Sequence, residues 1–99
     1  MTPQTSTPRE TMRHYLAQLA EELTRNGLLA ELVGAISKPY LMVALADTPN
    51  HTERVLCQLD GDGSWSFWWA WGQPIGTVDD LDLVVNRILT VLRSVEAEQ

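Results

Sequence analysis

The clearest pattern along the chain is the alternation at residues 64–71, a stretch that holds all four tryptophans and the only phenylalanine. Successive side chains of a strand point to opposite faces of a sheet. The aromatic residues that would share one face are Trp65, Phe67, Trp69 and Trp71. Each ring can bury about 150–250 Å², so this face belongs in the core of a small domain. Trp68 points to the other face and needs a different partner.

Two segments, one near each end of the chain, have apolar residues at helical spacing. The first follows a capping box at residues 7–10 and stops at an Asn-Gly pair, which predicts a helix over about residues 8–25. The second follows Thr77, a good N-cap residue, and predicts a helix from about 78 to 95.

Four strands are predicted between these helices. Residues 28–37 alternate weakly, and Gly27 and Gly34 argue against a continued helix, so we interpret them as a strand with a bulge at Gly34. The glycines of residues 60–63 predict a hairpin turn, and residues 72–76 end the last strand. The other three predicted strands are 40–46, 54–60 and 64–71.

The order of elements, α-β-β-β-β-α, indicates an α+β fold. Short connections predict a four-stranded antiparallel meander, and each helix has a single apolar stripe that must pack on something apolar. We expect a two-layer sandwich with the N- and C-terminal helices on one face of the sheet. The chain length of 99 residues suits one domain, which we place at residues 7–97 after a disordered tail at residues 1–6.

The sheet face away from the helices is the best candidate for function. A solvated face usually reads polar, but this one includes apolar residues on three neighbouring strands, namely Tyr40, Met42, Leu56 and Trp68. Exposed together, they would form a patch of about a few hundred Å², a size typical of an interaction surface, and Trp, Tyr and Met are enriched in interface cores. The alternative is that the loop at 47–53 or the N-terminal tail covers them.

The strand residues on the opposite face of the sheet are assigned to the side that the helices cover. That set consists of Leu41, Val43, Leu45, Val55, Cys57, Leu59 and the four aromatic residues of the 64–71 strand. This assignment follows from the two-residue period alone.

The formal net charge is −6, with 13 acidic and 7 basic residues. Direct binding of nucleic acid needs a basic surface, and the sequence has none. The acidic residues are scattered, which favours a role in solubility. Attraction to a basic partner, such as a DNA-binding regulator, is the functional alternative.

The start of the chain lacks the basic and apolar regions of a signal peptide, and no apolar run is long enough to span a membrane. Cys57 is the only cysteine, so no disulfide can form within the chain. These features predict a cytoplasmic protein.

No catalytic or metal motif accompanies the aromatic strand. His14, His51 and Cys57 lack the spacing of metal ligands, and a zinc site needs three or four such groups. We predict that Cys57 is a buried small hydrophobe, although a Cys–His nucleophile pair stays open. The acidic turn at 60–63 lacks the Glu that a calcium loop requires. We therefore predict no metal and no cofactor and assign no catalytic residue, and the question of enzymatic activity stays open.

The segment at 55–69 resembles one found in small acidic actinobacterial proteins of unknown function. The matching features are the cysteine strand Val55-Leu56-Cys57, the acidic turn Asp60-Gly61-Asp62-Gly63 and the strand Ser64-Trp65-Ser66-Phe67-Trp68-Trp69. Some of those proteins are similar to products found beside helix-turn-helix regulators. The resemblance implies a protein-binding or regulatory accessory role and assigns no site residues.

The sequence thus predicts a protein-binding or regulatory accessory protein that uses the open sheet face, either as a homodimer or with another protein. The alternative is a small-molecule carrier or enzyme with a pocket between the Trp-rich strand and the helices. A cavity of roughly 300 Å³ or more with converging polar groups would favour this alternative.

Overall fold

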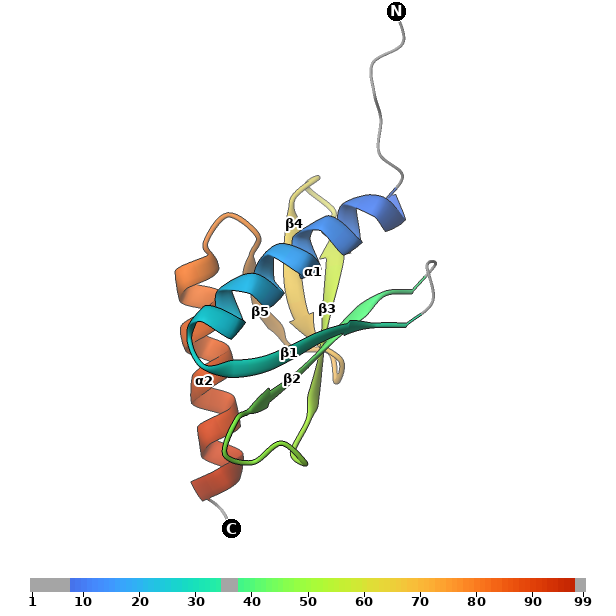
Figure 1. The fold of residues 1–99 in the computed structure, drawn as a ribbon. Helices are drawn as coiled ribbons and strands as arrows, with labels where there is room; N and C mark the ends of the chain where they lie inside the picture. Colours follow the sequence, from blue (N-terminus) through green and yellow to red (C-terminus); the bar gives the residue numbers. More distant parts are fainter. Residues whose placement is uncertain (1–7, 35–37, 98–99) are drawn as a thin grey trace, which may run out of the picture.

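The computed structural model describes residues 8–34 and 38–97 of the chain. Along the chain, one helix precedes and one helix follows five strands (Figure 1). The elements are α1 (Pro8–Arg25), β1 (Leu28–Val33), β2 (Tyr40–Leu45), β3 (Glu53–Leu59), β4 (Trp65–Trp69), β5 (Pro74–Thr77) and α2 (Leu81–Ala97). The predicted tail at 1–6 and Thr7, the first residue of the predicted capping box, lie outside the described residues.

The strands form one antiparallel sheet in the order β1-β2-β3-β4-β5. The α+β class and the meander are therefore confirmed, but the predicted number of strands, four, is wrong. The missed strand is β5, which follows a turn at Gly72 (φ +100°) and pairs with β4. It has only four residues, and its proline and glycine hide the alternation of a strand.

The start of the second helix also differs from the prediction. Thr77 is the last residue of β5 and not the N-cap, because the chain stays extended for one strand longer than expected. Asp80 takes the capping role: its side chain accepts a hydrogen bond from the Leu83 N–H at 3.4 Å. The first helix has the predicted bounds, and Gly27 (φ +85°) follows its end.

The predicted bulge at Gly34 is absent from β1, which ends at Val33. Gly34 follows the strand with φ +98°, a conformation that favours glycine. A bulge occurs instead between Phe67 and Trp68, where β4 pairs with β5.

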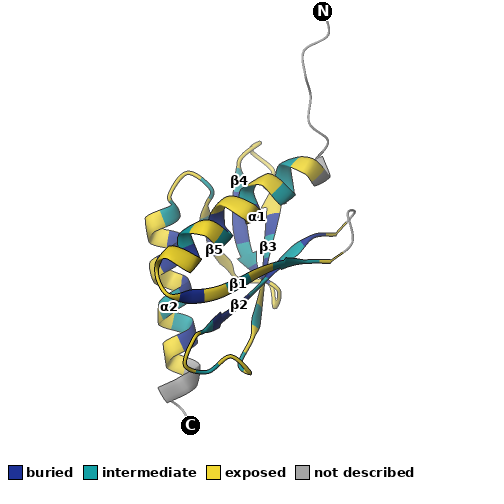
Figure 2. Ribbon diagram, viewed as in Figure 1, coloured by how far each residue is buried: buried dark blue, intermediate teal, exposed yellow. Residues whose placement is uncertain are grey.

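Both helices pack on one face of the sheet and contact each other, α1 over β1, β2 and β3, and α2 over β2 and β5. Figure 1 shows α1 lying across the sheet and α2 standing along its β5 side. Figure 2 shows buried segments on the strands next to the helices, and the pairing registers place the strand residues of the core cluster on this one face. They include Leu41, Val43, Val55, Cys57, Phe67, Trp69 and Ile75. This cluster confirms the two-layer architecture and most of the residues predicted for the helix-facing side of the sheet.

Two residues predicted for the core, Leu59 and Trp71, are each 53% exposed. Leu59 is the last residue of β3, and Trp71 lies beyond the end of β4 in the turn before β5. The Trp71 ring stacks on Trp69 at 4.7 Å between ring centroids. Leu45 is partly buried at the end of β2. The prediction is thus wrong for Trp71, which lies beyond the strand, and for Leu59, which ends β3 where its side chain stays exposed.

The packing leads to a first prediction. Trp69 is 3% exposed and Phe67 is fully buried, so Trp69→Ala should lower the free energy of unfolding by about 3–5 kcal/mol. The matched control is Trp71→Ala, which loses a stacked but exposed ring and should cost only about 0.5–1.5 kcal/mol. Chemical denaturation followed by circular dichroism measures both, and equal losses would contradict the face assignment.

Candidate functional site

The open face of the sheet carries an apolar row that crosses all five strands. We call it the apolar row, and its members are Val33, Tyr40, Leu56, Trp68 and Pro74. The pairs Val33–Tyr40, Leu56–Trp68 and Trp68–Pro74 lie directly opposite one another. Tyr40 and Leu56 flank the last pair between β2 and β3, which joins Leu41 to Val55. Three of the four predicted interface residues are therefore neighbours.

Met42, the fourth predicted interface residue, lies in the next row. It stands between Glu31 on β1 and Arg54 on β3, and both charged side chains are exposed. The four predicted residues are each partly buried. At the β2 end of the face, Met42 and Pro49 help to line a hollow of about 470 Å³. The loop after β2 therefore borders this end of the face.

The indole nitrogen of Trp68 has an unusual position. The ring as a whole is partly exposed, but Nε1 is buried and has no hydrogen-bond partner within the described part of the chain. An unsatisfied buried donor costs about 1–3 kcal/mol. The open face thus holds a large aromatic ring whose polar group is unpaired by its own chain.

Arg54 is the cation at the centre of this face. Its guanidinium lies over the Tyr40 ring, 5.2 Å from the centroid, a geometry in which the ring quadrupole attracts the cation. Within residues 8–34 and 38–97, the ion pair that forms joins Arg25 to Glu22, so Arg54 has no carboxylate partner there. It is therefore available to a negative group outside this fold.

A groove of about 580 Å³ opens where β2 and β3 separate. The two strands pair over 41–43 and 53–55, and β3 then continues to Leu59. The groove is lined on the open side by residues of the apolar row and at its base by residues under α1. Its lining consists of Met12, Lys38, Pro39, Tyr40, Arg54, Leu56, Cys57 and Gln58.

Cys57 has the structural position that the sequence predicts. It is 3% exposed, and burial, followed by the negative charge of Asp60, raises the pKa of its thiol to about 12. A thiol that stays protonated is a poor nucleophile. His14 lies on an exposed part of α1, and His51 lies in the loop before β3. In the residues that the structure describes, no three His, Cys, Asp or Glu side chains converge on a metal site.

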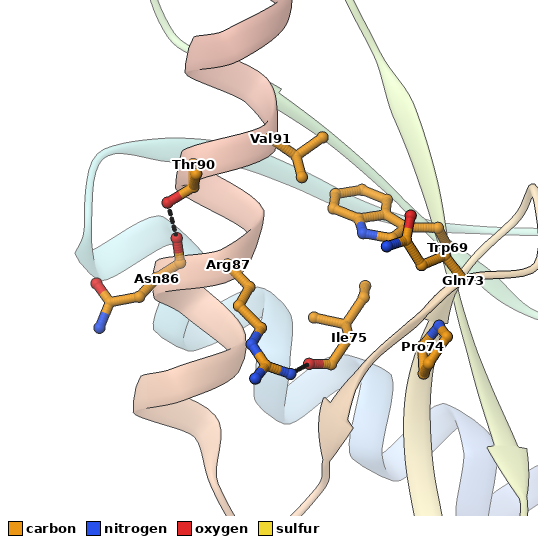
Figure 3. Close-up of a pocket in the computed structure, with 8 residues that line it drawn as sticks. All are labelled: Trp69, Gln73, Pro74, Ile75, Asn86, Arg87, Thr90 and Val91. Atoms are coloured by element: carbon orange, nitrogen blue, oxygen red, sulfur yellow. Dashed lines mark hydrogen bonds between the residues drawn. The ribbon is translucent and has the colours of Figure 1, made fainter.

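A third hollow, of about 340 Å³, lies between β5 and α2 (Figure 3). The sequence pattern does not single out its residues. Its strand side comes from the β4–β5 hairpin and its helix side from one face of α2. The lining residues are Trp69, Gln73, Pro74, Ile75, Asn86, Arg87, Thr90 and Val91. The volume exceeds the 300 Å³ set above for a ligand pocket, but the polar groups do not converge: Figure 3 shows Asn86 directed away from Trp69, and Arg87 donates a hydrogen bond to the Ile75 carbonyl. The helical spacing of residues 86, 87, 90 and 91 can be seen in the sequence. The strand that packs against this helix face, β5, is not predicted, so the sequence does not indicate a hollow there.

Comparisons with models of known protein families, with curated proteins and with solved structures find no match for this chain. No described helix is both long and apolar enough to cross a lipid bilayer. The function therefore has to be argued from the open face of the sheet and from the hollow between β5 and α2.

The raised pKa of Cys57 predicts a specific loss of stability at high pH. An ordinary thiol ionises near pH 9.0, whereas the folded thiol does so near 12. As the pH rises, the thiol therefore ionises first in the unfolded chain, which stabilises the unfolded state. The contribution of Cys57 to the free energy of unfolding is complete below pH 9.0 and falls by about 1.4 kcal/mol per pH unit between the two pKa values.

The measurement compares the free energy of unfolding of the parent and of Cys57→Ala across this range. The variant should show a shallower decline, and the native parent should react slowly with a thiol reagent at neutral pH. Parallel declines with rapid labelling of the native parent would show an accessible, reactive thiol.

Proposed function

We propose that this chain is a protein-binding module that pairs with a second copy of itself through the open sheet face. The observation that carries the proposal is the apolar row, which places Trp68 beside Leu56 and Pro74 with its Nε1 donor unpaired. Covering a partly exposed indole removes apolar surface from water.

The charges beside the apolar row favour a second copy as the partner. Glu31, Met42 and Arg54 lie side by side on three strands, in the order negative, apolar, positive. A two-fold interface brings the same patch of both subunits together. Because each copy carries both Glu31 and Arg54 on this patch, such an interface can set opposite charges of the two copies together. An unrelated acidic partner would satisfy Arg54 but would repel Glu31.

The wider role is an extension of this proposal. A dimer with an acidic surface suits an accessory protein, and the resemblance of the segment at 55–69 to actinobacterial proteins points the same way. We propose that it acts in the cytoplasm, where the lone Cys57 stays reduced. The carrier alternative is supported by one specific observation, the hollow beside Trp69.

The first test replaces the tryptophan of the apolar row. Trp68→Glu would bury an unpaired charge between the copies and should weaken association by at least about thirtyfold, the loss expected for a hot-spot residue. The matched control is Trp71→Glu, which changes an exposed tryptophan of the same segment and should leave association intact. Sedimentation velocity gives the association constant, and circular dichroism checks the fold.

Met42→Lys is a second variant in case Trp68→Glu unfolds, because a lysine stem keeps the length of methionine and its charge can reach water in the monomer. We expect it to fold and to dissociate. A monomeric parent at micromolar concentration, or a folded Met42→Lys that still dimerises, would rule out this interface.

A charge swap tests the second copy as the partner. Glu31→Arg and Arg54→Glu each place like charges in contact and should weaken self-association about tenfold or more. The double variant restores opposite charges and should recover most of the parent affinity at low salt. Failure of the double variant to recover, in a chain that does dimerise, would show that these two residues do not face each other.

A further inference from the structure

The groove between β2 and β3 opens where the two strands stop pairing. Their ladder ends at the pair Leu41–Val55, and Figure 1 shows β2 leading away from β3 on the far side of that point. Met12 reaches the groove from α1, while Arg54 and Leu56 border it from β3. Its volume of about 580 Å³ lies within the range of small-molecule sites.

Two exposed cations, Lys38 and Arg54, line this groove, and no carboxylate lines it. Neither cation forms an ion pair within residues 8–34 and 38–97. The contact of Arg54 with the Tyr40 ring positions the guanidinium without cancelling its charge. In a chain with a net charge of −6, two unpaired cations at one groove favour an anionic group in the ligand.

The accessible apolar groups of the groove are aliphatic. Met12 and Leu56 are partly exposed, and an unbranched methionine side chain adapts to the shape of what it contacts. The Tyr40 ring offers little free surface, because the Arg54 guanidinium lies over it at 5.2 Å from the centroid. Gly34 also packs so close that a Cβ there would be 3.0 Å from the ring. The lining therefore suits an alkyl chain better than a stacked aromatic ring.

We propose that this groove binds an unbranched aliphatic carboxylate, with the chain against Met12 and Leu56 and the carboxylate near Lys38 and Arg54. Burial of the chain removes apolar surface of both molecules from water. The carboxylate supplies the charge that the two cations lack within their own chain.

This proposal goes beyond self-association, although the groove shares Arg54 and Leu56 with the open face. Met42 does not line the groove. The variant Met42→Lys, designed above to be monomeric, therefore allows ligand binding to be measured apart from dimerisation. It should bind the carboxylate at least as tightly as the parent does.

The test is a titration of the ¹⁵N-labelled full chain with hexanoate, followed by NMR. The backbone amide signals of Leu56 and Gln58 should shift at millimolar concentrations, and the indole signal of Trp71, outside the groove, should not. Acetate keeps the charge but lacks most of the chain, and 1-hexanol keeps the chain but lacks the charge. Both should bind about tenfold more weakly or worse, and benzoate should bind more weakly than hexanoate.

Lys38→Gln and Arg54→Gln should each weaken hexanoate binding about tenfold or more and leave 1-hexanol nearly unchanged. Lys38 precedes β2 on an exposed bend, so its variant should fold even if loss of the Arg54–Tyr40 contact disturbs the sheet. The matched control is Arg93→Gln, which removes an exposed cation of α2 outside the groove and should have no effect.

A membrane surface presents the same alkyl chains and negative charge, so cosedimentation with vesicles of anionic phospholipid is a second arm. We expect no cosedimentation, because an acidic chain is repelled by an anionic surface. Binding to vesicles in place of hexanoate would overturn the proposal. So would an absence of shifts with hexanoate, equal affinity for acetate, 1-hexanol or benzoate, unchanged affinity in both cation variants, or loss of binding in Met42→Lys. A monomeric parent that binds hexanoate would instead overturn self-association alone.

Discussion

The structure depends on the burial of one face of β4 in the core. Phe67 is fully buried and Trp69 nearly so, and together they fill the space under the two helices. Because side chains of a strand alternate, this burial forces Trp68 to the opposite face. A register slip by one residue would bring Trp68 inward and move two large rings into water, which makes the pairing of β4 with β3 strongly specified. The open face and its partly exposed tryptophan are thus a consequence of how the core is built.

The same strand explains why much of the fold could be predicted from the sequence. The alternation at 64–71 assigns the faces of its neighbours once antiparallel pairing is assumed, and the helical stripes show which face is covered. The prediction failed where these signals end. β5 has four residues with a proline and a glycine, so it owes its strand conformation to pairing with β4 and not to its own pattern. Leu59 and Trp71 stand at or beyond the ends of strands, where the alternation continues in the sequence but the helices no longer provide cover.

The two candidate sites differ in how far the sequence could reveal them. Tyr40, Met42, Leu56 and Trp68 were grouped by periodicity alone, and the register places them in adjoining rows. The hollow beside Trp69 needs the exact position of β5 against α2, and this contact joins segments separated by a turn that the sequence shows only as a strand ending. Its volume also depends on how side chains from two elements fail to fill the space between them. No pattern in one dimension reports such a gap.

The distribution of charge links the two faces. In an acidic chain a cation has many potential carboxylate partners, yet Arg54 and Arg87 have none within the described residues. Each is instead held by a group of its own chain that carries no net charge, Arg54 by the Tyr40 ring and Arg87 by the Ile75 carbonyl. These contacts fix the direction of a guanidinium without cancelling its charge, which lowers the entropy that a later ion pair would cost. The two arginines lie on opposite layers, beside adjacent tryptophans of β4. On the open face this leaves a positioned positive charge beside the partly exposed rings of Tyr40 and Trp68, whereas the Trp69 ring on the helix layer is buried.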